Sequence, residues 1–253
     1  MAASHAAAGD IAPQINDAAN AGKHVTTDVI NAGIDFELEL DLRRSELHGK
    51  TSSGEALTES LHGQPSTELA ATIQKFLMTA GVDKGLAPKG RKNNENQAVF
   101  TSYSAETAQH FGHALNAISA AMESFRGGIR EETSPIQLWP HHFDLSLLWL
   151  PGGKISGQDP DNEEYADKQM NFGFTFGDAG IAEPYFCITA YPLPDAFSSL
   201  HLPTGTTWHS EGFSGALFLY RSLIENDDPN GYLVRLWNSL LSAGREHLTT
   251  DPP

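Results

Sequence analysis

The feature that most constrains the fold is a two-residue alternation in the middle of the chain. From Phe143 to Trp149, large apolar residues occupy every second position, and Asp144 and Ser146 lie between them. Successive side chains of a β-strand point to opposite faces, so this period predicts a strand with one apolar and one polar face. We predict a single strand over residues 135–150, placed between a hydrophobic core and a polar surface.

Alternation of the same kind, bounded by Gly, Pro and Ser, predicts further strands along the chain. The clearest lies at 35–42, where Phe36, Leu38 and Leu40 alternate with acidic residues. The remaining predicted strands cover 47–51, 55–61, 170–176, 185–191, 206–211 and 216–220.

Three other segments repeat apolar residues with helical spacing. The predicted helices begin at Pro65, after Ser104 and at Pro229, and Asp228 is the expected N-cap of the third. We therefore expect an α+β fold, in which about three helices pack on one face of an antiparallel sheet. The opposite, polar face is expected to form a pocket.

The chain shows no linker that would clearly separate two domains. Residues 1–33 are rich in Ala, Asn, Asp and Gly and hold few large apolar residues, so we expect a flexible lead-in. Residues 34–248 are expected to form a single domain. Two fused lobes, 34–130 and 134–248, are the alternative.

Composition excludes several classes of partner. Acidic residues outnumber basic ones by 32 to 16, giving a formal net charge of −16, which disfavours nucleic acid and anionic membranes as partners. No run approaches the ~18 apolar residues of a membrane helix, and the N-terminus lacks the pattern of a secretory signal. Cys187 is the only cysteine, so we expect no intrachain disulfide and no cysteine-based zinc site. These features predict a cytoplasmic protein.

The polar face of the predicted sheet carries hydroxyl, amide and imidazole groups interleaved with aromatic rings. A merely solvated face more often carries Lys, Glu and Arg, whereas groups of this kind can be satisfied by a bound small molecule. A plain solvated face remains the alternative. The candidate ligand-binding residues are Asn171, Tyr191, Trp208 and Arg221.

A candidate metal site combines His142 and Asp144 with the distant His209. The first two lie two residues apart on one strand face, about 7 Å along the strand. Two imidazoles and one carboxylate form the facial triad of Fe(II) oxygenases. The pattern resembles that of the 2-oxoglutarate oxygenases, with His201 as an alternative third ligand and Arg221 placed to hold an acidic cosubstrate. In the structural alternative, His142 and Asp144 bond to each other and fasten a strand end.

Three further residues are candidates for acid–base catalysis. Glu183 and Glu211 each flank a predicted strand on its polar face, where a carboxylate could act as a general base. Tyr185 lies on the same face. Cys187 has no basic neighbour in the sequence and is expected to be a buried thiol rather than a nucleophile.

Four segments resemble a known family. They are SPIQLWPHHFDLSLLW, EEYADKQMNFGF, EPYFCITAYPLP and TWHSEGFSGA, and they lie within 134–220. They look like a mostly bacterial family that is classified as a domain of unknown function, with a weaker likeness over 35–130. The resemblance implies that the four segments belong to one folded unit, and it carries no catalytic assignment.

The sequence thus leaves several functions open. We expect a small-molecule enzyme of unspecified reaction, oxygenase-like or hydrolytic, with a divalent iron, zinc or manganese ion as its expected cofactor. The alternative is a non-catalytic protein that binds a small ligand or forms a homo-oligomeric interface through its aromatic residues.

Overall fold

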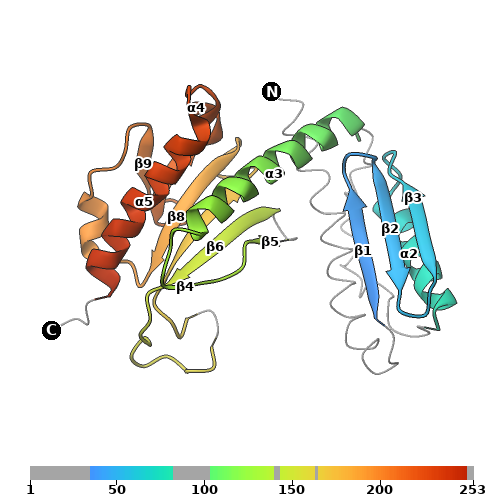
Figure 1. Ribbon diagram of the computed structural model, residues 1–253, viewed down its shortest axis with the longest axis horizontal. Helices are drawn as coiled ribbons and strands as arrows, with labels where there is room; N and C mark the ends of the chain where they lie inside the picture. Colours follow the sequence, from blue (N-terminus) through green and yellow to red (C-terminus); the bar gives the residue numbers. More distant parts are fainter. Residues whose placement is uncertain (1–34, 82–102, 140–142, 163–164, 250–253) are drawn as a thin grey trace. The chain divides into compact units, whose positions relative to one another are not determined.

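The computed structural model has an α+β fold with two antiparallel sheets (Figure 1). It describes residues 35–81, 103–139, 143–162 and 165–249. The chain divides into two compact units, one of residues 1–114 with 140–142 and the other of 115–139 with 143–253. The expected lead-in, 1–33, lies outside the described residues.

The N-terminal unit contains a three-stranded sheet and a helix that covers one face of it. Strands β1 (Phe36–Asp41), β2 (Glu46–Thr51) and β3 (Ala56–Ser60) pair antiparallel in that order, as the alternation predicts. Helix α2 (Ser66–Thr79) places Leu69, Ile73, Phe76 and Leu77 against Leu47 of the sheet. Gly49 lets the Phe76 ring approach, because a Cβ at this position would lie 2.8 Å from Phe76 Cε1.

The C-terminal unit contains a seven-stranded antiparallel sheet. The strand order is β4-β6-β7-β8-β10-β9, with β5 also paired to β6. The strands are β4 (Glu132–Thr133), β5 (Gln137–Trp139), β6 (Asp144–Leu150), β7 (Gln169–Thr175), β8 (Tyr185–Tyr191), β9 (Thr206–His209) and β10 (Gly215–Leu219).

Helices cover one face of this sheet and leave the other face polar. Helix α3 (Ala105–Arg126) contributes Met122 and Phe125 to the core, and α5 (Pro229–Leu248) contributes Trp237 and five leucines (Figure 1). The sheet supplies Leu147, Trp149, Phe172, Phe174 and Phe186 from alternate strand positions. The short elements η1 (Asp195–Ser199) and α4 (Tyr220–Ile224) complete the unit. Asp228 caps α5 as predicted, since its side chain accepts a hydrogen bond from the Gly231 N–H.

The predicted single strand over 135–150 is wrong. Residues 137–139 and 144–150 form two strands, β5 and β6, that pair with each other, with Trp139 opposite Asp144. Phe143 has a left-handed backbone with φ 59°, which ends the strand geometry before Asp144. Pro140 has no N–H and is unsuited to the interior of a sheet. The chain therefore reverses direction between Trp139 and Asp144, and the alternating residues that follow Phe143 belong to β6 alone.

An ion pair joins the edge of the large sheet to the last turn of α5. Arg245 Nε lies 2.6 Å from Glu131 Oε1, and Arg245 Nη2 lies 2.7 Å from Glu131 Oε2. These hydrogen bonds lower the pKa of Glu131 from 4.5 to about 2. Because the folded pKa is the lower one, the stabilisation is present above pH 4.5 and is lost as the pH falls toward 2.

We expect Glu131→Gln to lower the free energy of unfolding by about 1 kcal/mol at pH 7, a value reduced for the partial exposure of both side chains. Urea unfolding at a series of pH values should show this difference shrinking between pH 4.5 and pH 2. Glu123→Gln is the control, because Glu123 forms a more exposed pair with Arg126 within α3. A deficit that stays constant down to pH 2 would assign the effect to packing rather than to charge.

Candidate functional site

The polar face of the seven-stranded sheet holds the candidate site. The strand register places Ser146, Gly173 and Cys187 opposite one another on β6, β7 and β8. Leu145 pairs with Phe174, so the preceding residue of β6, Asp144, lies opposite the following residue of β7, Thr175. Thr175 in turn pairs with Tyr185 of β8. We call the following set the central polar patch: Asp144, Ser146, Asn171, Thr175, Tyr185 and Cys187.

Several side chains of the central polar patch are buried although none of the described helices covers this face. The exposed fractions are 8% for Ser146, 6% for Thr175 and 4% for Tyr185. Ser146 Oγ donates a hydrogen bond to Asn171 Oδ1 at 2.7 Å, and the Tyr185 hydroxyl donates to Asp178 Oδ2 at 2.7 Å. The Gly177 N–H donates to Thr175 Oγ1 at 3.4 Å. The patch is thus built from uncharged groups with defined partners, around the single carboxylate of Asp144.

The loop between β9 and β10 folds back over this face. The Phe213 ring lies parallel to the Tyr185 ring, with centroids 6.1 Å apart, and 4.6 Å from the His209 ring. Tyr185 of β8 pairs with Leu219 of β10. In an extended strand, Leu219 would lie about 20 Å from Phe213. Contact between the two rings therefore requires the loop to turn back, and Gly212, with φ 87°, provides the left-handed residue before Phe213.

The Cys187 thiol lies over Gly173. A Cβ at Gly173 would be 2.7 Å from Cys187 Sγ and 3.5 Å from Asn171 Nδ2. Desolvation, with a further contribution from the charge of Asp144, raises the pKa of Cys187 to about 12. The group remains a thiol at neutral pH, as expected from the sequence, and is unsuited to nucleophilic catalysis.

Tyr185, a predicted catalytic residue, belongs to the central polar patch. Desolvation and the hydrogen bond to Asp178 raise the pKa of its phenol above the ordinary value. The phenol therefore stays protonated at neutral pH. It can take part in hydrogen bonding, but it does not supply a phenolate base.

The structure does not bring the described metal candidates together. Asp144 is on β6 and His209 is on β9, with three strands between them, which separates their backbones by roughly 19 Å. His209 Nε2 instead contacts the Glu211 carbonyl oxygen at 2.6 Å. His142 lies outside the described residues. Within the described segments, no group of three His, Cys, Asp or Glu residues is arranged to hold a metal ion.

Two predicted functional residues are paired with each other. Arg221 Nε lies 3.3 Å from Glu183 Oε2, so this base candidate and this ligand-binding candidate form an ion pair at the end of the sheet. Glu211, the other base candidate, is exposed in the β9–β10 loop beyond the end of its predicted strand.

The four predicted ligand-binding residues lie in different surroundings. Asn171 belongs to the central polar patch. Tyr191 lies further along the same face, where Gln158 Nε2 donates to its hydroxyl at 3.4 Å. Trp208 pairs with Ala216 and packs against the helix-covered core, away from the central polar patch.

Sequence reasoning missed Asp178 and Phe213. Asp178 accepts hydrogen bonds from the N–H groups of Gly180 and Ile181 as well as from Tyr185. An Asp two residues before a Gly is a signal for this turn, but nothing local indicates the bond to Tyr185. Phe213, between Gly212 and Ser214, has a signal for a turn but none for the ring that it contacts.

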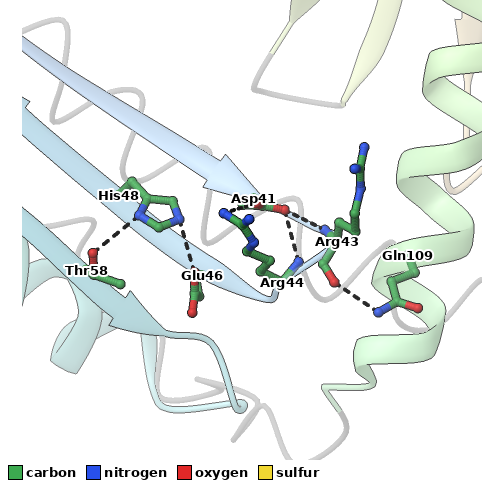
Figure 2. Close-up of polar contacts among 7 residues, drawn as sticks. All are labelled: Asp41, Arg43, Arg44, Glu46, His48, Thr58 and Gln109. Carbon is green, nitrogen blue, oxygen red and sulfur yellow. Dashed lines mark hydrogen bonds and ion pairs between the residues drawn. The ribbon is translucent and has the colours of Figure 1, made fainter.

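The solvent face of the N-terminal sheet is a second polar cluster, shown in Figure 2. His48 lies between two neighbours, with Nε2 3.2 Å from Glu46 Oε2 and Nδ1 3.3 Å from Thr58 Oγ1. Asp41 Oδ1 accepts the Arg43 and Arg44 N–H groups, and these backbone bonds lower its pKa.

The same hairpin is also tied to α3. Gln109 Nε2 donates to the Arg43 carbonyl oxygen at 3.0 Å (Figure 2). The contacts of this cluster close the β1–β2 turn and link neighbouring strands. These structural contacts are sufficient to explain why the residues of this cluster are polar. We therefore place the candidate site on the larger sheet.

These features define an α+β protein with a polar patch on the sheet face opposite its helices. Residues 16–252 match the model of a family described as a "Family of unknown function (DUF5996)", and the chain belongs to this family. Neither the curated proteins nor the solved structures that were compared include a match to the chain. None of the described helices is long and apolar enough to cross a membrane.

Proposed function

We propose that this protein binds a small organic molecule at the central polar patch and acts on it as an enzyme. The observation that carries the proposal is the burial of Ser146, Thr175 and Tyr185 on the sheet face opposite the described helices. A solvated sheet face has no need of buried hydroxyl groups. A ligand-binding wall has that need, because a few placed polar groups orient the bound molecule.

The backbone next to Asp144 supports the proposal. A left-handed Phe143 costs about 1–2 kcal/mol relative to an ordinary conformation. Strain of this kind collects at functional sites, where the surrounding structure holds a side chain in a required position. Here it sets the start of β6 and thereby the position of Asp144.

Asp144 is the proposed reacting group. Of the carboxylates predicted as bases, Glu183 is paired with Arg221 and Glu211 is exposed in a loop. Asp144 faces the buried part of the sheet, where desolvation raises the pKa of both Cys187 and Tyr185 and the charge of Asp144 adds a smaller contribution. A carboxylate in these surroundings suits general acid–base chemistry. Tyr185 has the proposed role of orienting the substrate.

A ligand screen with matched variants tests this function. We expect compounds that raise the melting temperature of the wild-type protein, since binding to the folded state stabilises it by RT ln(1 + [L]/Kd). The shift should be lost in Asp144→Asn and reduced in Thr175→Val. It should persist in Thr207→Val, the same substitution at an exposed residue of β9. Hits that stabilise all four proteins equally would show that the patch is not the site.

A divalent metal ion bound by His142 and Asp144 remains a proposed cofactor, supported by their H-x-D spacing. Elemental analysis of wild type, His142→Ala and Asp144→Ala tests it. Stoichiometric iron, zinc or manganese that is lost in both variants would support the metal, with a third ligand other than His209. Wild-type protein that stays metal-free after incubation with each ion would rule the pair out.

A non-catalytic interaction protein is the second candidate function. Leu138 and Trp139 of β5 are 43% and 39% exposed, and exposed apolar residues at a sheet edge suit a homo-oligomeric contact. We further propose a cytoplasmic location, supported by the single thiol of Cys187.

We also propose that the four segments of the sequence resemblance recur in a mostly bacterial family. The support is that these segments supply four residues of the central polar patch: Asp144, Asn171, Tyr185 and Cys187.

A further inference from the structure

The β9–β10 loop crosses part of the polar face between two fixed ends. The ends, His209 and Gly215, pair with each other, and a Cβ at Gly215 would lie 2.9 Å from Thr189 Cγ2 of β8. Tyr185, whose ring stacks on Phe213 of the loop, is four residues from Thr189 along β8, a distance of about 13 Å. To reach Tyr185, the loop therefore passes over the intervening row of the sheet.

The row under the loop contains Cys187 of β8 and Leu217 of β10, which pair with each other. Leu217 is only 8% exposed, although its neighbours Ala216 and Phe218 are the residues of β10 that belong to the helix-covered core. An apolar side chain that is buried on the face away from the helices needs another cover, and the path of the loop supplies one. The Cys187 thiol, whose pKa is raised to about 12 by desolvation, lies in the same row.

The loop is fastened mainly through one ring. Four of its five residues are exposed: Ser210, Glu211, Gly212 and Ser214. Phe213 is partly buried, and its ring contacts both Tyr185 and His209. His209 Nε2 also contacts the Glu211 carbonyl oxygen at 2.6 Å. A Cβ at Gly212 would meet nothing within 4 Å, so the backbone next to Phe213 has both open space and the conformational freedom of glycine.

Two other segments that reach the polar face are fastened more firmly. In the loop between β7 and β8, Asp178 accepts three hydrogen bonds. In the hairpin between β6 and β7, the Ile155 N–H donates to the Ala166 carbonyl oxygen at 2.8 Å. Lys154 and Asp167 add an ion pair at 2.9 Å to the same hairpin. Segments with few buried contacts open at the lowest free energy, so the β9–β10 loop is the one of these three that opens most readily.

We infer that the β9–β10 loop is a flap over the polar face, with Phe213 as its latch. In the closed state of this structure, the flap covers Cys187 and Leu217 and holds its ring against Tyr185. In the open state the ring leaves Tyr185, and this end of the central polar patch becomes accessible. The opening is a property of the loop alone, whereas its use as a gate for a small molecule rests on the proposed function.

The single cysteine of the chain makes the opening measurable. We would follow the alkylation of Cys187 by iodoacetamide in the full chain, at urea concentrations below the unfolding transition. A thiol reacts as its thiolate, so a covered and desolvated Cys187 reacts only when the flap opens. We expect wild-type protein to react at least about 10-fold more slowly than the urea-unfolded chain. At low urea the rate should hardly depend on urea, because the opening of a short loop exposes little surface.

Three variants assign the opening to the latch. Phe213→Ala should raise the rate at low urea at least about 10-fold, since it removes the ring stack and the buried apolar area of the latch. Phe213→Tyr keeps the ring and should react at the wild-type rate. Phe197→Ala is the matched control, because Phe197 is buried in the helix-covered core. This control should speed the reaction only through global unfolding, with a steep dependence on urea.

The outcomes separate the flap from the function of the patch. Labelling that follows global unfolding at every urea concentration, in wild type and Phe213→Ala alike, would overturn the flap. A wild-type rate equal to that of the unfolded chain would overturn it too, because Cys187 would then lie uncovered. Equal acceleration in the alanine and tyrosine variants would show that the ring is not the latch. Each of these results leaves the patch open as a ligand site, whereas a ligand screen without hits counts against the proposed function and leaves the labelling rates unchanged.

Discussion

Replacing Trp237 with alanine is expected to lower the free energy of unfolding by about 3–5 kcal/mol, the range for removing a buried aromatic side chain. Trp237 is fully buried in the middle of α5, and its ring packs on Phe125 of α3 and Phe186 of β8. Those contacts join both covering helices to the sheet. The cavity left by alanine would lie at the centre of this core.

Trp237→Phe is expected to cost much less, about 1–2 kcal/mol. The indole N–H has no hydrogen-bond partner among the described residues, so phenylalanine removes a buried unsatisfied donor while it keeps an aromatic ring. Denaturant unfolding of both variants measures the difference. Trp139→Ala is the control, since Trp139 is 39% exposed and its loss should cost less than ~1 kcal/mol. Equal costs for the phenylalanine and alanine variants at 237 would show that the indole nitrogen is required.

Much of the fold follows from periodicity because each sheet has one covered face. In β1 the residues Phe36, Leu38 and Leu40 face the α2 core, and in β8 the residues Phe186 and Ile188 face the α5 core. A sheet face that is covered by helices carries an apolar residue at every second strand position, and this period can be recognised in the sequence. The same logic failed at 135–150. There the chain reverses direction just before the alternation begins, and a left-handed phenylalanine carries no local signal.

The site was less predictable because its geometry depends on strand order. Residues two apart on one strand, such as Asp144 and Ser146, could be placed together from the sequence. His209 could not be, because β9 pairs outside β10 at the far edge of the sheet from β6. The contacts of Tyr185 with Asp178 and Phe213 come from loops, whose tertiary partners are not encoded in periodicity.

Gly244→Ala is expected to destabilise the protein although it replaces the poorest helix former after proline with the best. Helix propensity alone would favour alanine by about 0.5–1 kcal/mol. However, a Cβ at Gly244 would lie 2.2 Å from Met170 Sδ and 3.1 Å from Trp149 Cζ3. Met170 and Trp149 are both fully buried, so neither can move into solvent. Overpacking of this kind costs about 1–3 kcal/mol, and we expect it to outweigh the propensity gain.

Gly112→Ala provides the matched control within another helix. A Cβ at Gly112 would lie 3.5 Å from Leu42 Cβ, an ordinary contact, so this variant should gain about 0.5–1 kcal/mol. The sign of the change, measured by urea unfolding, thus distinguishes the two glycines. Adding Met170→Val to Gly244→Ala removes the clashing sulfur, and the double variant should be more stable than the sum of the single changes predicts. Strict additivity would show that Met170 does not exclude a side chain at 244, and that the close packing of α5 on β7 has another origin.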